Sequence, residues 1–207
     1  MLGWARMKTR SARFVIGVGW LFAVGVGLAV VMNYESSAGH AGETPSAWPK
    51  EASIILDAAR PTLVMFAHPK CPCTRASLGE LNRLLANCDN RPAVHVFFLK
   101  PDGQNDDWAK DDLWRSAANI PGLVLHEDAG GREAEHFGAQ TSGHVVLYDS
   151  RGRLLFKGGI TAARGHAGDN TGENLILARL SGQDAGTAKE TPVFGCALRE
   201  TCEVSSN

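Results

Sequence analysis

The residues of this sequence best suited to chemistry are its five cysteines, two of which stand close together in Cys71-Pro72-Cys73. This motif follows a short apolar run, 62–67, and precedes an amphipathic segment, 76–88. At the start of a helix, unpaired backbone N–H groups and the helix dipole favour the thiolate, which is the nucleophilic form of cysteine. Proline suits the first helical position. The position therefore predicts that Cys71 is an exposed N-cap residue whose thiolate is favoured, with Cys73 as the neighbouring thiol. An inert structural pair of cysteines is the alternative.

The other three cysteines lie apart from this motif. Cys88 has the same helical phase as the leucines of the segment 76–88, so we interpret it as a packed side chain, with a resolving thiol as the alternative. Cys196 and Cys202 stand in a polar, Gly-rich tail. They are either a structural pair or resolving partners of the active site, and an odd number of cysteines leaves at least one thiol over.

Two histidines are candidates to tune these thiols. His68 lies three residues before Cys71, and His144 opens a later apolar run. An imidazole near a cysteine can stabilise its thiolate by charge or by a hydrogen bond. The same residues allow a second interpretation, because Cys71, Cys73 and His144 are soft ligands suited to copper, as in copper chaperones of the Sco type. We expect no cofactor, and copper is the alternative.

The Gly-rich segment 158–170 carries Arg164, His166 and Asp169. Such a composition is typical of a solvated loop. The functional alternative is a lid or partner surface beside the cysteines.

Strands and helices alternate along the chain, which predicts an α/β domain. Ser150-Arg151-Gly152 joins the last two strands as a hairpin, and Asn170 with Glu173 predicts the capped start of the last helix. The expected strands are 62–67, 93–99, 122–128, 144–149 and 153–159, and the expected helices are 76–88, 106–119, 132–139 and 170–180.

The segments FAHPKCPCT and FGAQTSGHVVLYDSRGRLLFKGGI, in this order of elements, resemble the thioredoxin-like superfamily over about residues 53–180. The similarity extends to its membrane-tethered TlpA-like and peroxiredoxin-like branch, which includes RedB-like proteins. The resemblance implies a thioredoxin-like mixed β-sheet flanked by helices, a redox-active Cys71 and thiol-disulfide oxidoreductase activity. A peroxiredoxin-like thiol peroxidase is another alternative, although His68 replaces the threonine that peroxiredoxins carry three residues before their cysteine.

The sequence departs from the pattern of this superfamily at two places. The usual Cys-x-x-Cys would need a cysteine where Thr74 stands, and the second thiol has moved to Cys73. A Cys-x-Cys disulfide closes a small, strained ring, and strained disulfides are easily reduced. The cis-proline that normally faces the active cysteine is also missing, and Ser142-Gly143-His144 occupies its stretch. We expect His68, Pro72, Thr74 and His144 to support the site.

A charge-free run at residues 14–32 is long enough, at about 28 Å as a helix, to cross a bilayer. Glu35 follows it, and basic residues precede it, so the positive-inside rule places the N-terminus in the cytoplasm and the domain on the periplasmic side. The basic residues are Arg6, Lys8, Arg10 and Arg13. A cleaved signal peptide, with Gly39 and Ala41 near the cleavage site, is the alternative.

We expect five parts in order along the chain: a basic cytoplasmic N-terminus, a transmembrane helix, a linker, a thioredoxin-like domain and a C-terminal tail. The formal net charge is −1, and the part beyond the basic N-terminus is mildly acidic, which argues against nucleic acid as a partner. The expected partner is an exported protein with thiols or disulfides. The boundaries are 1–13, 14–32, 33–52, 53–180 and 181–207.

Overall fold

The centre of the fold is the strand β1 (Thr62–Ala67), in which every residue is buried. Alternate side chains of a strand point to opposite faces of the sheet, so Leu63 and Met65 belong to one core and Val64 and Phe66 to another. The computed structural model describes residues 2–105, 107–183 and 186–199, with side chains from residue 13 onward. Because both faces of β1 are covered, the strand reads as a continuous apolar run.

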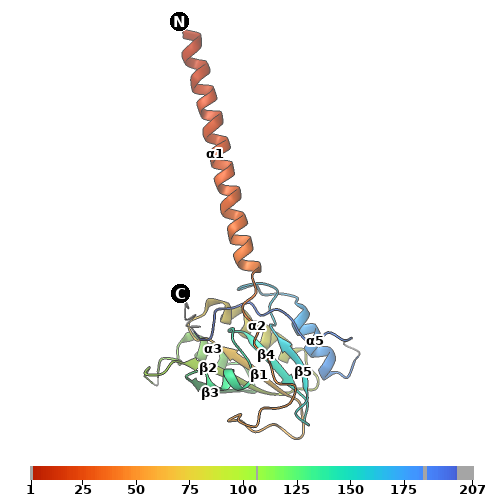
Figure 1. Cartoon of the computed structure of the whole chain (residues 1–207). Coiled ribbons are helices and arrows are strands. Elements are labelled where there is room, and N and C mark those ends of the chain that lie inside the picture. The colour runs from red at the N-terminus through yellow and green to blue at the C-terminus, as the bar shows by residue number, and fades with distance from the viewer. Residues whose placement is uncertain (1, 106, 184–185, 200–207) are drawn as a thin grey trace, which may run out of the picture. The chain divides into compact units, whose positions relative to one another are not determined.

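Five strands form one mixed sheet in the order β3-β2-β1-β4-β5 (Figure 1). β1 pairs in parallel with β2 (Ala93–Lys100), which pairs in parallel with β3 (Leu123–Ala129). On its other side, β1 pairs antiparallel with β4 (His144–Tyr148), and β4 forms a hairpin with β5 (Leu154–Gly158). Because β1 and β2 are parallel, their C-terminal ends lie at the same end of the sheet. The antiparallel β4 starts at this end, where His144 is opposite Phe66.

Helices cover both faces of this sheet. The face of Leu63 and Met65 is covered by α2 (Pro72–Ala86), α3 (Asp112–Ala118) and α5 (Thr171–Leu180). The opposite face packs against the short helix α4 (Arg132–His136) and against residues 48–56, which precede the sheet. The expectation of a mixed sheet flanked by helices is confirmed.

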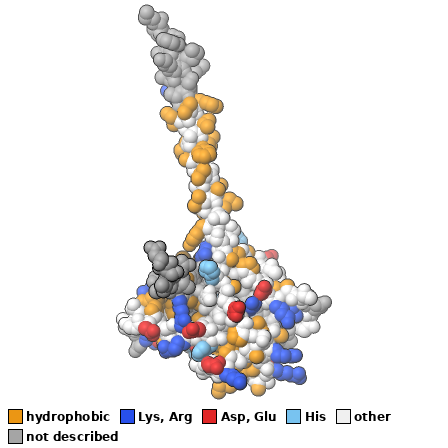
Figure 2. Space-filling model, viewed as in Figure 1, with side chains coloured by type: hydrophobic (Ala, Val, Ile, Leu, Met, Phe, Trp, Pro, Cys, Tyr) orange, Lys and Arg blue, Asp and Glu red, His pale blue; other side chains and the backbone are white. Residues whose placement is uncertain are grey.

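The helix α1 (Leu2–Ser36) is a separate unit of the chain. Its part Arg13–Ser36 has a mean hydropathy of 2.4, and none of that apolar stretch is buried against other residues. Figure 2 shows hydrophobic side chains along this part of the helix. Its length and composition fit a membrane anchor or a signal sequence.

Three of the expected helices have clearly different limits in the structure, and the one expected at 132–139 ends at His136. The helix expected at 106–119 begins only at Asp112, because the Asp111 carboxylate accepts a hydrogen bond from the Leu113 amide and caps the helix there. The helix expected at 76–88 runs from Pro72 to Ala86. Cys88 therefore lies beyond the end of the helix and not on its apolar face, although it still packs against the core beside it.

Part of the expected linker 33–52 belongs to other elements. Residues 33–36 are the last residues of α1. Ala47 forms an antiparallel bridge with Arg153, and the Trp48 ring packs edge-on against Phe137 and Tyr148, at 5.1 and 5.3 Å between ring centroids. A tryptophan in contact with two core rings buries a large apolar area. This segment therefore completes the second core of the domain.

Candidate functional site

Cys71 is the N-cap residue of α2, and Pro72 is the first helical residue, as the sequence predicts. The turn that leads from β1 into the helix is held by a hydrogen bond from the Cys71 amide to the His68 carbonyl (3.1 Å). The prediction that Cys71 is exposed is wrong, because its side chain is only 1% exposed. The C-terminal tail covers it.

The tail places Cys196 directly against Cys71, with 2.9 Å between the two Sγ atoms. The sequence left the role of Cys196 open, and the structure brings this cysteine of the tail into the site. Its backbone is held too, since the Ser142 amide donates a hydrogen bond to the Cys196 carbonyl (2.8 Å). Cys202, the other tail cysteine, lies outside the described residues.

Hydrogen bonds make Cys71 the most acidic of the clustered thiols. Burial works to raise the pKa of Cys71, but the Cys196 thiol and the backbone amides of Cys196, Thr74 and Cys73 donate to its sulfur and lower the pKa overall. Burial and the negative charge of Cys71 raise the pKa of Cys73. Burial, followed by the hydrogen bond to Cys71, raises the pKa of Cys196 to about 12. The site thus holds one favoured thiolate and two thiols that keep their protons.

Thr74 stands where the resemblance would place the second cysteine, and Ser142 belongs to the stretch where it would place the cis-proline. Their hydroxyl oxygens lie 2.8 Å apart, and both residues are buried. The Thr74 hydroxyl donates to the His68 carbonyl, and the Ser142 hydroxyl accepts from the His68 amide (2.8 Å). The next residue, Gly143, has φ +90°, and a Cβ there would lie 2.9 Å from the Ser77 Oγ atom. These contacts tie the start of β4 to the cysteine turn, a role of Ser142 that the sequence analysis missed.

The groups that lower the pKa of Cys71 are thiol and backbone groups, and the two candidate histidines make other contacts. The His68 ring accepts a hydrogen bond from the Lys70 amide and packs edge-on against Trp108. His144 is paired with Phe66 in the sheet, so its side chain lies on the face opposite α2, where Thr44 is its neighbour (3.4 Å). The expectation that His144 supports the thiols is therefore wrong.

The alternative ligand set of Cys71, Cys73 and His144 does not converge, because the sheet separates the imidazole from the two thiols. Within the described ranges, no group of three or more His, Cys, Asp or Glu side chains is placed to hold a metal ion. Burial, with a smaller contribution from the charge of Lys157, lowers the pKa of His144 to about 4. The ring is therefore neutral near pH 7.

The loop between β5 and α5 reaches the cysteines through Arg164 and Gly165. The Arg164 guanidinium donates a hydrogen bond to the Gly195 carbonyl, next to Cys196. The Gly165 amide donates to the Cys73 sulfur, and the positive charge of Arg164 also acts on that thiol. His166 and Asp169 are exposed, so the loop meets the site through only part of the segment that the sequence singled out.

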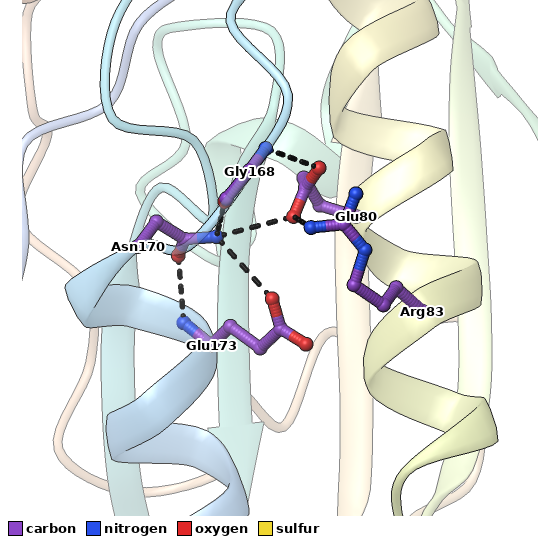
Figure 3. A network of polar contacts seen from close by, with 5 residues as sticks. All are labelled: Glu80, Arg83, Gly168, Asn170 and Glu173. Atoms are coloured by element: carbon purple, nitrogen blue, oxygen red, sulfur yellow. Dashed lines mark hydrogen bonds and ion pairs between the residues drawn. The ribbon is translucent and has the colours of Figure 1, made fainter.

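A buried polar network holds this loop against α2 (Figure 3). The Glu80 carboxylate on α2 is fully buried and accepts hydrogen bonds from the Gly168 amide (3.0 Å) and the Asn170 side chain (3.3 Å). Asn170 also caps α5 by accepting from the Glu173 amide (2.8 Å), as its sequence position predicts. Arg83 pairs with Glu80 at 3.2 Å. Since buried charges persist only when paired, the network fixes the loop that carries Arg164.

The structure is similar to solved structures from several bacteria, although no protein-family model and no curated protein matches the sequence. A hypothetical protein from Sinorhizobium meliloti 1021 is 23% identical, with a TM-score of 0.52 over 81% of this chain and 98% of the other. An uncharacterised conserved protein from Geobacillus kaustophilus is 17% identical, with a TM-score of 0.52 over 79% and 92% of the two chains.

An exposed lipoprotein thioredoxin from Streptococcus pneumoniae is 17% identical, with a TM-score of 0.44 over 60% of this chain and 86% of the other. The fold of this chain, a five-stranded mixed sheet with helices on both faces, is thioredoxin-like. A mixed sheet with helices on both faces is what the resemblance implied, and the structure adds the strand order β3-β2-β1-β4-β5.

Proposed function

We propose that this protein is a membrane-anchored, extracytoplasmic thiol-disulfide oxidoreductase whose reactive group is the Cys71 thiolate of the Cys-Pro-Cys motif. The thioredoxin-like fold is the scaffold on which this chemistry would operate. The order of elements and the segments FAHPKCPCT and FGAQTSGHVVLYDSRGRLLFKGGI are the basis for placing the chain near RedB-like proteins. The substrate class is an exported protein with a disulfide or with oxidisable thiols.

The observation that carries the proposal is the environment of Cys71. Its sulfur receives hydrogen bonds from the Cys196 thiol and from backbone amides at the start of α2, which lower its pKa. Only a thiolate attacks a disulfide, and a lower pKa increases the fraction of thiolate near neutral pH. A thiolate that lies beside further thiols can form a disulfide with one of them, so the arrangement supports two-electron exchange.

The reaction balances as two successive displacements. The Cys71 thiolate attacks one sulfur of the partner's disulfide, a Cys71–partner bond forms, and the other partner sulfur leaves as a thiolate that takes up a proton. A second thiol of this chain then loses its proton and attacks the Cys71 sulfur, which releases the partner's second thiol. The partner disulfide is reduced to two thiols while two thiols of this chain are oxidised. The reverse sequence oxidises a partner dithiol.

The activity can be tested on the full chain in detergent micelles, with glutathione disulfide and a reduced peptide dithiol as substrates. We expect Cys71→Ser to abolish the catalysed exchange and Cys88→Ser to leave its rate unchanged, because Cys88 lies beyond the opposite end of α2. Retention of the rate in Cys71→Ser, or an equal loss in Cys88→Ser, would contradict the proposal.

The location is part of the proposal and rests on the apolar part of α1 and the basic residues before it. Charge asymmetry of this kind orients single membrane helices with the basic end in the cytoplasm. We expect protease added to spheroplasts to digest the domain, with a cytoplasmic protein as the protected control. A mature protein that begins near Gly42 and washes free of membranes would overturn the anchor.

A further inference from the structure

We infer that the redox-active disulfide of this protein joins Cys71 to Cys196, and that the tail segment 193–198 serves as a tethered substrate strand that occupies the partner's place. The inference rests on the proposed function, because it names the second thiol of the same site. It replaces the pairing within Cys-Pro-Cys that the motif alone favours.

The backbone of the tail is paired with the chain as a strand would be. Thr141 and Ala197 form an antiparallel bridge. On either side of it, the Ser142 amide donates to the Cys196 carbonyl (2.8 Å) and the Leu198 amide donates to the Gln140 carbonyl (2.9 Å). Hydrogen bonds of this kind are the way in which an extended peptide adds to an exposed strand edge. The tail thus presents a cysteine to Cys71 as an extended peptide would.

The sequence of the tail is fitted to this position. A Cβ on Gly195 would lie 2.0 Å from the Ser142 carbonyl oxygen, so only glycine allows the tail to approach so closely. Val193 and Leu198 are buried on the two sides of Cys196 and anchor the segment. The Arg164 guanidinium donates a hydrogen bond to the Gly195 carbonyl, which lies between these two residues. The close approach at Gly195, the buried Val193 and Leu198 and the Arg164 hydrogen bond therefore hold the segment that carries Cys196.

The protonation of the pair suits a stepwise exchange. While Cys71 is a thiolate, Cys196 keeps its proton and donates it in the S–H···S contact of 2.9 Å. Once Cys71 is bound to a partner sulfur, it no longer carries a negative charge. This charge is one of the causes that raise the pKa of Cys196, so the pKa of Cys196 falls when the charge is lost. Cys196 can then lose its proton more readily and attack.

The steps are as follows. In the reduced protein the tail is held only by non-covalent contacts, so a partner disulfide displaces it and receives the attack of the Cys71 thiolate. One partner thiol leaves with a proton. The tail then returns, the Cys196 thiolate attacks the Cys71 sulfur, a Cys71–Cys196 bond forms, and the second partner thiol leaves with the proton that Cys196 gave up. The tail and the partner compete for the same backbone groups at residues 140–142. Formation of the Cys71–Cys196 bond therefore also expels the partner.

The pairing can be read directly by disulfide mapping of the full chain. The protein is oxidised with glutathione disulfide in micelles, free thiols are alkylated, and tryptic peptides are analysed by mass spectrometry. The peptides 71–75 and 190–199 separate the motif from the tail cysteine. We expect the two peptides to be linked in the wild type and in Cys73→Ser, and the link to be absent in Cys71→Ser. Cys88→Ser is the matched control that should keep it.

A second variant tests the fit of the tail without removing a thiol. In Gly195→Ala we expect the fraction of molecules with the Cys71–Cys196 disulfide, at a fixed ratio of reduced to oxidised glutathione, to fall about tenfold or more. The reason is that the added methyl group overpacks against Ser142, and overpacking costs enough free energy for a change of this size. The matched control is Gly79→Ala, an exposed position at which a Cβ meets nothing within 4 Å, and it should leave the linked fraction unchanged.

Different outcomes would overturn the Cys71–Cys196 pairing and the oxidoreductase function on which it rests. A bond within peptide 71–75 and none to peptide 190–199, with glutathione exchange intact, would overturn the Cys71–Cys196 pairing and leave the oxidoreductase proposal standing. A Cys71 that forms neither a disulfide nor a glutathione adduct in any variant would overturn both. An equal linked fraction in Gly195→Ala and the wild type would overturn the role assigned to the fitted tail.

Discussion

The two ends of helix α2 each carry a cysteine, and the two cysteines have opposite properties. Burial works against the thiolate at both. At the N-terminal end, Cys71 receives hydrogen bonds from the first amides of the helix and from Cys196, and its pKa is lowered. Cys88 lies beyond the C-terminal end, where its thiol donates to the Asn90 carbonyl (3.2 Å) and burial raises its pKa.

This difference shows that the residue type alone does not make a reactive thiol. A helix presents N–H groups at its start and carbonyl groups at its end, so one terminus stabilises a negative charge and the other does not. A cysteine with a lowered pKa therefore lies at the start of this helix, and a packing cysteine with a raised pKa lies beyond its end.

A nearby histidine is the rival explanation for the lowered pKa of Cys71. A substitution of His144 tests this explanation, and it is also the variant with the largest expected effect on the free energy of unfolding. The folded pKa of His144, at about 4, lies below the value of about 6.5 that an unperturbed histidine has, so the unfolded chain binds more protons between these values. The stability that this group contributes is present above pH 6.5 and is lost as the pH falls toward 4, by up to about 3 kcal/mol.

We expect His144→Gln to remove this acid-side loss without changing the pKa of Cys71. The measurement is urea unfolding of the full chain in micelles at pH 7 and pH 4.5, with the exposed His166→Gln as control. A raised Cys71 pKa in His144→Gln would restore the histidine as the tuner of the thiol.

The network around Glu80 tests whether buried polar contacts hold the loop that carries Arg164 against α2. Asn170→Ala removes the cap of α5 and a hydrogen bond to the buried Glu80 carboxylate, so we expect a loss of roughly 1 to 2 kcal/mol in unfolding free energy. Asn174→Ala, an exposed position on the same helix, should change it by less than about 0.5 kcal/mol. Equal effects of the two variants would show that the network does not hold the loop.

The smallest effect is expected at the C-terminal end. Cys88→Ala removes a half-buried sulfur that packs against the core, and we expect a loss of about 0.5 to 1 kcal/mol with thiol exchange intact. The loss is measured by urea unfolding and the exchange by the glutathione assay. Lost exchange at unchanged stability would make Cys88 a resolving thiol and would remove the contrast between the two ends.

The local part of the site could be predicted from the sequence. The proline after Cys71, the apolar run before it and the amphipathic segment behind it specify a strand, a capped turn and a helix through contacts within a few residues. The Asn170 cap was predictable for the same reason. The buried face of His144 was also open to prediction, because it shares its alternation with Val146 and Tyr148, whose side chains pack opposite α2.

The tail could not be predicted in this way. Residues 189–198 show no helical or strand periodicity, and their position depends on hydrogen bonds to Gln140, Ser142 and Lys157, far back in the chain. Long-range pairing of this kind leaves little trace in a single sequence. The available signal was a glycine directly before Cys196, flanked by apolar residues at 193 and 198. Without the position of the tail, the sequence predicts an exposed Cys71, whereas the paired tail buries it.

The most direct test of the account is to titrate the individual thiols of the reduced full chain. Cysteine labelled with ¹³C at Cβ reports the thiolate by NMR without any need for reagent access, and Cys→Ser variants assign the signals. We predict that Cys71 titrates below the ordinary thiol pKa and Cys88 above it, and that Cys196→Ala moves the pKa of Cys71 upward because a hydrogen-bond donor is lost. A Cys71 that titrates at or above Cys88, or that is unaffected by Cys196→Ala, would contradict the account.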